Sequence, residues 1–209
     1  MKATNNVYVV DDDEAVRDSL AMLLETAGHA VATFASAGDF LDFCTPGILG
    51  CVILDVNMPG MEGPALQQEL TRRGMRLPVI FLSGYGTIPT TVRTIKAGAM
   101  DFLTKPVIGS VLLSRVQEAL ERCSTLQQQT EIYQSIVSRL ATLTEREREI
   151  MGLAITGQTS KDIAQRLGIS FRTVEIHRAH VMQKTGASNL LELARIAATF
   201  ASGQTSCEP

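Results

Sequence analysis

Charged and hydroxyl side chains follow the hydrophobic runs of this sequence, where strands would end. The run "VYVV" leads into Asp11 and Asp12, "CVILD" ends in Asp55, "PVIFLS" ends in Ser83, and "DFL" is closely followed by Lys105. Two carboxylates ~4 Å apart repel by about 1 kcal/mol in water and by roughly 4 kcal/mol at an effective dielectric constant of 20. If the aspartates converge, a cation must therefore lie among them.

These residue types together suit the transfer of a phosphoryl group. Open, acidic, oxygen-only coordination suits Mg²⁺, which keeps several waters and shares its other positions with a phosphate; Mn²⁺ can substitute for it. A lysine, a hydroxyl and a bound cation are the parts of a phosphoryl-transfer site. Because a carboxylate that attacks phosphorus becomes an aspartyl phosphate, we expect one aspartate to be a phosphoryl acceptor.

Strand-like runs alternate with helical patterns over residues 1–122. The runs begin at Val7, Ala30, Cys51, Pro78 and Asp101, and the helical patterns span Glu14 to Ala27, Ala37 to Phe43, Pro64 to Arg73, Ile88 to Ala97, and Ser110 onward. Right-handed crossovers stack such a (βα)5 chain as a parallel sheet with helices on both faces. Ligands bind beyond the carboxyl ends of such strands. With the first strand central and the third beside it, the carboxylates would share one pocket.

The periodicity changes after Arg122. No Pro or Gly interrupts residues 124–140, so the fifth helix can continue into a helical linker over residues 123–142. Apolar residues recur at intervals of seven, at Leu112, Ala119, Leu126, Tyr133 and Leu140. Their companion positions are polar, so a weak coiled coil and a solvated helical linker both stay open. Four short helical patterns follow: Thr144 to Ile155, Ser160 to Leu167, Ser170 to Lys184, and Ser188 to Phe200.

Charge is distributed unevenly along the 209 residues. Residues 1–122 hold 14 acidic and 10 basic side chains, whereas residues 157–200 hold 3 and 6. An acidic front and a basic back suggest different partners. Acids arrive by Asp11, before the apolar segment of a signal peptide could form, and no apolar run reaches membrane-spanning length, so we expect a cytoplasmic protein. The four cysteines lack metal or disulfide spacing and receive no role.

The front half resembles the receiver domain of bacterial two-component response regulators. "VVDDD", "CVILDVNMPGMEG", "IFLSGYG" and "AGAMDFLTKP" match that family in order and spacing, and residues 5–122 are covered. The resemblance implies a flavodoxin-like doubly wound sheet in which Asp55 accepts the phosphoryl group. It implies that Asp12 ligates Mg²⁺ directly and that Asp11 acts through a water. Asp55 and the backbone carbonyl of Asn57 would complete the protein ligands.

The same resemblance gives roles to three residues beyond the acids. Lys105 would pair with the phosphoryl oxygens, and Ser83 would hydrogen-bond one of them and draw the following loop inward. Phe102 would then turn from solvent toward the space that Ser83 vacates. Lys105–Pro106 is a candidate cis peptide, which for an X-Pro bond costs only about 0.5 to 1 kcal/mol. Asp13 is expected to be a solvated or helix-capping acid.

The back half resembles the LuxR and NarL type of DNA-binding domain, joined to a receiver as in the FixJ group of regulators. The matching segment runs from Leu143 to Ala197 and includes "LTEREREIMGLAITGQTSKDIAQRLGIS". Thr144 and Glu147 form a capping box for its first helix. The next two helices, with a turn at Gly168, have the pattern of a helix-turn-helix, whose second helix enters the major groove.

Spacing on that second helix turns Val174, His177 and Val181 inward. The resemblance places base-edge contacts around Glu175, Ile176 and Ala179, and phosphate contacts at Lys161, Arg172, Thr173, Arg178 and Lys184. Glu175 departs from members that carry a lysine there; a carboxylate could accept from cytosine N4 or repel phosphate. We expect His177 and His180 to be packing or surface residues, not metal ligands.

The combined interpretation is a two-domain transcriptional response regulator, not an enzyme. Its parts are a receiver at 1–122, a linker at 123–142, a helix-turn-helix domain at 143–201 and a tail at 202–209. Expected partners are a sensor histidine kinase, double-stranded promoter DNA, RNA polymerase and, on phosphorylation, a second copy of the chain; no membrane is expected.

Two alternatives stay open. "DDDEA" contains the Asp-x-Asp of haloacid-dehalogenase-type phosphatases, which would leave Asp55 without a role. Alternatively, the chain carries a receiver whose C-terminal helices bind a protein instead of DNA.

Overall fold

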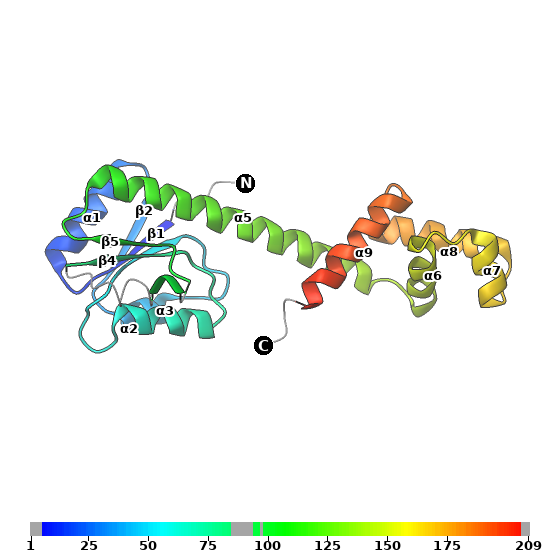
Figure 1. Cartoon of the computed structure of the whole chain (residues 1–209), viewed down its shortest axis with the longest axis horizontal. Helices are drawn as coiled ribbons and strands as arrows, with labels where there is room; N and C mark the ends of the chain where they lie inside the picture. Colours follow the sequence, from blue (N-terminus) through cyan, green and yellow to red (C-terminus); the bar gives the residue numbers. More distant parts are fainter. Residues whose placement is uncertain (1–5, 85–93, 97, 206–209) are drawn as a thin grey trace. The chain divides into compact units, whose positions relative to one another are not determined.

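Figure 1 shows the computed structural model of the chain, which describes residues 6–84, 94–96 and 98–205. The chain divides into two compact units, Met1–Gln127 and Gln128–Pro209. Among the described residues, no helix combines the length and the apolar character needed to cross a bilayer.

The first unit is built on a parallel sheet. Its strands are β1 (Asn6–Val10), β2 (Ala30–Phe34), β3 (Cys51–Asp55), β4 (Val79–Ser83) and β5 (Asp101–Thr104). They pair in the order β2-β1-β3-β4-β5, and all neighbouring strands are parallel. The predicted doubly wound topology, with the first strand beside the third, is therefore confirmed. Every residue of β3 and β4 is buried, which explains why their sequences are continuous apolar runs.

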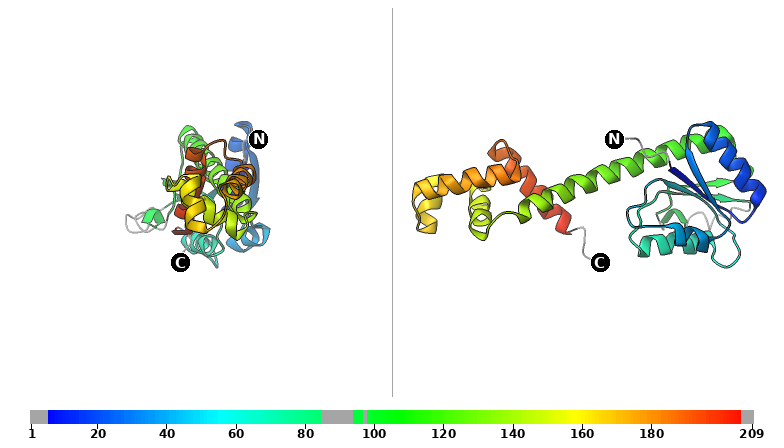
Figure 2. Two further views of the ribbon diagram at one scale, coloured as in Figure 1. Left: turned by 90° about the vertical axis from the view of Figure 1, so that its right-hand side faces the viewer. Right: turned by 180° about the vertical axis from the view of Figure 1, so that it is seen from behind.

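Helices cover both faces of this sheet (Figure 2). They are α1 (Glu14–Thr26), α2 (Ala37–Phe43), α3 (Gly63–Arg72) and α5 (Gly109–Ala141). Leu24 of α1 and Leu112 of α5 share one apolar cluster with Ile53, whereas Phe40 of α2 shares a second cluster with Leu54. Adjacent residues of β3 thus point into two different cores, as the alternation of a strand requires.

Local sequence signals account for the boundaries of these helices. Asp13 caps α1, because its carboxylate accepts hydrogen bonds from two backbone N–H groups of the first turn, as expected of a capping acid. Gly28, after α1, has a φ of +89°, which glycine adopts without a Cβ clash. Of the predicted helix from Ile88 to Ala97, residues 94–96 are helical and the others lie outside the described residues.

The second unit is helical. After the end of α5 it contains α6 (Glu145–Ile155), α7 (Ser160–Leu167), α8 (Phe171–Thr185) and α9 (Leu190–Thr205). The predicted capping box of Thr144 and Glu147 is present, and Gly168 ends α7 with a φ of +65°. Helix α9 continues beyond its predicted end at Phe200, since no proline interrupts the chain before Pro209.

Helix α5 is one continuous helix of 33 residues, so the predicted extension of the fifth helix into the linker is confirmed. Its seven-residue repeat has two separate causes. Leu112 and Ala119 are buried in a core of the first unit, and Leu140 is buried in a core of the second. Leu126 and Tyr133 are half-buried. The coiled-coil alternative therefore depends on these two residues.

At Gly63, its first residue, α3 approaches the backbone of β3 so closely that there is no room for a side chain. A Cβ atom at this position would collide with the backbone carbonyl oxygen of Asp55, and no side-chain rotation could relieve the collision. We expect Gly63→Ala to lower the free energy of unfolding by about 1–3 kcal/mol, the usual cost of overpacking. Urea denaturation of the full chain, followed by circular dichroism, would measure it.

The matched control is Gly38→Ala in α2. Gly38 is exposed, and its Cβ would lie 3.6 Å from Ser36 Oγ, an ordinary contact. This change should be neutral, or stabilise by up to about 1 kcal/mol by restricting the unfolded chain. Equal stability of the two variants would contradict the close packing at Gly63.

Candidate functional site

The residues predicted to carry chemistry meet at the carboxyl edge of the sheet. Asp11 follows β1, Asp55 ends β3, and Lys105 follows β5. Lys105 Nζ lies 2.6 Å from Asp11 Oδ2 and 2.6 Å from Asp55 Oδ1. The protein itself therefore supplies one cation to the two like charges.

Each oxygen of these two carboxylates has a hydrogen-bond donor. The backbone N–H of Asp13 donates to Asp11 Oδ1 at 3.1 Å, and that of Asn57 donates to Asp55 Oδ2 at 2.7 Å. Lys105 donates to the other two oxygens. Asp11 is 2% exposed and Asp55 is 6% exposed, so loss of a donor would leave a buried charge uncompensated.

Burial and pairing act on the pKa values of this cluster in opposite senses. Burial raises the pKa of Asp11, although hydrogen bonds from Lys105 and from the Asp13 backbone oppose the rise. Burial lowers the pKa of Lys105, but the hydrogen bonds to Asp11 and Asp55 outweigh it, and the net pKa is raised. Lys105 is therefore charged at neutral pH and holds both carboxylates.

Further oxygen donors lie next to this pair in sequence. Asp12 and Asn57 are exposed, whereas Asp11 and Asp55 are buried. Three carboxylates and the Asn57 carbonyl are the hard oxygen donors that Mg²⁺ and Mn²⁺ prefer, so these residues fit such a cation. Arg17, which the sequence interpretation missed, donates to the backbone carbonyls of Asp11 and Asp12 at 2.8 and 3.0 Å. Its place in the first turn after the acidic run was the available signal.

Ser83 and Phe102 occupy the two strands beside the cluster. Ser83 ends β4 and is fully buried, and its backbone carbonyl accepts a hydrogen bond from the Lys105 N–H at 2.8 Å. Phe102 on β5 is half-buried, with its ring centroid 6.4 Å from that of Phe81. The predicted cis peptide between Lys105 and Pro106 is present. The switch roles of Ser83 and Phe102 stay predictions.

Helices α7 and α8 form the predicted helix-turn-helix of the second unit. On α8, Val174 and Val181 are buried and His177 is half-buried, as their spacing predicts. Among the predicted DNA contacts, Lys161, Arg172, Glu175, Ile176 and Ala179 are exposed, and Thr173, Arg178 and Lys184 are half-buried. Most of the predicted set is thus accessible on this unit.

Two of the predicted phosphate contacts also hold the helices together. Arg178 Nη1 donates to Ser160 Oγ of α7 at 3.1 Å. Lys184 Nζ lies 2.6 Å from Glu147 Oε2 of α6 and 3.3 Å from the carbonyl oxygen of Thr142. The hydrogen bond from Lys184 is the main cause that lowers the pKa of Glu147 to about 2. The phosphate roles of Arg178 and Lys184 stay predictions.

Comparison with known proteins agrees with this arrangement in both units. Residues 7–117 match the response regulator receiver domain family, and residues 141–197 match the luxR family of bacterial regulatory proteins. The chain belongs to the two-component response regulators. This response regulator is 44% identical over 191 residues to the transcriptional regulatory protein FixJ of Azorhizobium caulinodans, covering 91% of the chain and 90% of the relative. It is 43% identical to the transcriptional regulatory protein TdiR of Thauera aromatica, covering 90% of the chain and 83% of the relative.

Solved structures of response regulators give the same result. The response regulator StyR superimposes with a TM-score of 0.88 at 39% identity, covering 92% of this chain and 98% of StyR. Full-length FixJ from B. japonicum superimposes with a TM-score of 0.59 at 37% identity, covering 96% and 99% of the two chains.

These matches confirm several predictions together. The family, the fold class and a transcriptional regulator in place of an enzyme are confirmed, and the phosphatase alternative falls away because both halves match regulator families. Receiver domains generally use Mg²⁺ for phosphorylation, and they imply a histidine kinase partner. A LuxR-type domain implies DNA binding, in place of the protein-binding alternative.

A substitution of Lys105 would test the electrostatics of the acidic cluster. Its ammonium forms ion pairs with Asp11 and Asp55, the two carboxylates that a metal ion would also need. Lys105→Ala removes a competing positive charge, so we expect Mg²⁺ to bind at least as tightly as to the wild type. Relief of about 1 kcal/mol of repulsion corresponds to roughly fivefold tighter binding. Isothermal titration calorimetry of the full chain would measure it.

Asp12→Ala provides the comparison, since it deletes an oxygen donor and leaves Lys105 in place. This variant should bind Mg²⁺ more weakly than the wild type. If Lys105→Ala lost as much affinity as Asp12→Ala, the placement of Lys105 as a competitor of the metal would be wrong.

Proposed function

We propose that Asp55 accepts a phosphoryl group from a sensor histidine kinase and that this modification controls promoter binding by the C-terminal domain. In this proposal residues 1–122 form the receiver, 123–142 a helical linker, 143–201 the DNA-binding domain and 202–209 a tail. The observation that carries it is the position of Lys105 Nζ, 2.6 Å from both Asp11 and Asp55. From this position the Lys105 ammonium can move from a carboxylate to the phosphoryl group that Asp55 accepts.

The proposed transfer takes place at one oxygen of the Asp55 carboxylate. A carboxylate oxygen of Asp55 forms the new O–P bond while the P–N bond to the kinase histidine breaks, and the electron pair returns to the imidazole, which takes up a proton. The Asn57 N–H keeps its bond to Oδ2, so Oδ1 is the reacting oxygen once Lys105 releases it. Lys105 then donates to the phosphoryl oxygens. Mg²⁺, or Mn²⁺ in its place, held by Asp11, Asp12, Asp55 and the Asn57 carbonyl, supplies further positive charge when bound.

Transmission is proposed to begin at β4 and β5. The Ser83 hydroxyl would donate to a phosphoryl oxygen, and Phe102 would turn inward as Ser83 moves. The backbone bond between Lys105 N–H and the Ser83 carbonyl supports this route, because it ties both phosphoryl-binding residues to one pair of strands. A displacement of Ser83 or Lys105 is therefore expected to displace the other residue as well.

DNA recognition through α8 is the proposed output. Base edges would be read around Glu175, Ile176 and Ala179, where a carboxylate can accept from cytosine N4. Phosphates would be held by Lys161, Arg172, Thr173, Arg178 and Lys184. Exposure of most of these side chains supports the proposal. At a promoter in the bacterial cytoplasm, RNA polymerase is the expected further partner.

Dimerisation is proposed as the link between phosphorylation and DNA binding. A single domain that neutralises about four phosphates is expected to bind weakly, with log affinity falling against log salt at a slope near −3.6. Two linked domains double the contacts, and the second contact becomes intramolecular, with a gain of about 10² to 10⁴ in avidity. A phosphorylation-dependent homodimer on two half-sites would therefore bind far more tightly than a monomer.

The phosphoryl acceptor can be identified by intact mass. With Mg²⁺ and acetyl phosphate, the wild type should gain one phosphoryl group, whereas Asp55→Asn should gain none. Asp18→Asn is the matched control, because it removes an exposed aspartate of α1 in the same way, and it should be labelled like the wild type. Unchanged labelling of Asp55→Asn would sink the assignment.

The salt dependence of DNA affinity tests the dimer. For the phosphorylated full chain we expect a slope near −7, about twice the value near −3.6 for the unphosphorylated chain. Fluorescence anisotropy with labelled promoter DNA would measure both, and acetyl phosphate-treated Asp55→Asn should keep the shallower slope. Equal slopes before and after phosphorylation would mean that dimerisation does not add phosphate contacts.

A further inference from the structure

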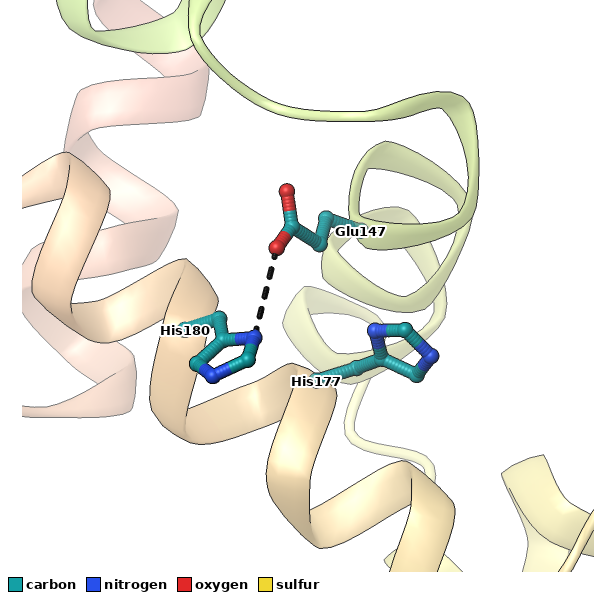
Figure 3. Close-up of side chains that lie close together, drawn as sticks. All are labelled: Glu147, His177 and His180. Atoms are coloured by element: carbon teal, nitrogen blue, oxygen red, sulfur yellow. Dashed lines mark ion pairs between the residues drawn. The ribbon is translucent and has the colours of Figure 1, made fainter.

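A group of potential ligands lies between α6 and α8, in the second unit. One ligand atom each from Glu147, His177 and His180 can be chosen so that all three lie within 4.8 Å of one another. Figure 3 shows both imidazoles on α8, with the Glu147 carboxylate of α6 directed toward His180 and the His177 ring turned to the other side. The sequence interpretation gave the histidines no partner, because their third member belongs to another helix.

The carboxylate of Glu147 has one oxygen engaged and one turned toward the histidines. Oε2 accepts from the Thr144 backbone N–H at 2.8 Å and from Lys184 Nζ at 2.6 Å. Oε1 is the oxygen that faces His180 Nδ1, 3.6 Å away. Glu147 is 3% exposed. The helix cap and the ion pair with Lys184 thus use Oε2, and Oε1 is left to interact with the histidines.

His177 contributes a nitrogen that is buried without a partner. In the part of the chain that the structure describes, His177 Nδ1 makes no hydrogen bond although the atom is inaccessible to solvent. A buried polar atom left unpaired costs about 1–3 kcal/mol, so an occupant that used this lone pair would be favoured. The His180 side chain is 52% exposed, which leaves the group open to solvent on that side.

A direct contact between His180 and Glu147 explains this arrangement poorly. A separation of 3.6 Å exceeds the usual N–H···O range, which ends near 3.2 Å. Two ligand atoms that each lie about 2.1 Å from a tetrahedral metal are roughly 3.4 Å apart, so this pair is already spaced for a shared ion. The ligand atom of His177 lies within 4.8 Å of the other two, so His177 has to move closer to join the same ion.

We propose that Glu147, His177 and His180 form a binding site for a divalent transition-metal ion, with Zn²⁺ the test ion. Two imidazoles and one carboxylate are a donor set that Zn²⁺ accepts, with a fourth position left to solvent. Lys184 stays on the other carboxylate oxygen, so Glu147 bridges the ion and the ammonium. The ion ties the first turn of α6 to the middle of α8, the proposed recognition helix. Bound metal therefore stabilises this domain by mass action.

The test is Zn²⁺ binding to the full-length chain by calorimetry. It is run under reducing conditions in excess Mg²⁺, which keeps the oxygen donors of the receiver occupied. Wild type is expected to bind one Zn²⁺ and to unfold at a higher temperature with it. His180→Asn should bind at least about 10- to 100-fold more weakly, since even loss of a group that merely supports a ligand has that effect. Because the His180 side chain is exposed, we expect this variant to fold like the wild type. Circular dichroism of the variant would check its folding.

His29→Asn is the matched control, because it also leaves two of the three histidines of the chain and lies in the first unit. It should bind Zn²⁺ like the wild type. Co²⁺ as a substitute ion should give visible absorption bands without the thiolate bands that cysteine ligands produce. Zn²⁺ affinity unchanged in His180→Asn, an equal loss in His29→Asn, or thiolate bands with Co²⁺ would each overturn the proposal.

Discussion

The contacts of the Lys105 ammonium with Asp11 and Asp55 are the interaction on which the functional edge of the sheet depends. A doubly wound parallel sheet brings the ends of its central strands together, and here both ends carry an acid in a buried position. Without a cation, two desolvated carboxylates would destabilise the edge that the fold creates. A lysine after β5 supplies that cation from across the sheet. The stability of this edge and its chemistry therefore rest on the same charge.

The second unit also pairs a buried carboxylate with a lysine, but there the lysine does not have to leave the carboxylate. Glu147 is as buried as Asp11 and is balanced by a lysine that stands 37 residues away, on α8. The capping box on α6 fixes the carboxylate, so the ion pair with Lys184 joins α6 to α8. In the first unit the lysine must leave its carboxylate for the proposed chemistry to occur. In the second unit Lys184 can remain on Oε2 of Glu147, because the proposed metal site uses the other oxygen, Oε1, which faces His180.

Sequence patterns predicted the elements and their order, since strand alternation, caps and glycines act over a few residues. They also brought Asp11, Asp55 and Lys105 together, because parallel topology alone sends strand ends to one edge. They missed the contact of Arg17 with the acidic loop, although that contact is local. They also missed the ion pair of Glu147 with Lys184, which depends on how α6 and α8 pack. The repeat along α5 was ambiguous for a related reason. Periodicity reports that a face is buried but not which core buries it, and Leu112 and Leu140 belong to different cores.

The two ion pairs that Lys105 already makes limit how the proposed phosphorylation could change the conformation of the protein. A ligand shifts a conformational equilibrium only by its difference in affinity for the two states. Lys105 already holds two carboxylates, so its bond to a phosphoryl group replaces an ion pair and adds little net attraction. The differential energy must then come from contacts that exist only after phosphorylation, of which a bond from Ser83 is the proposed one. Because the Ser83 carbonyl accepts a hydrogen bond from the Lys105 N–H, we expect movement of either residue to shift the ends of both β4 and β5. Displacement of β4 and β5, more than gain of charge pairing, would therefore carry the signal.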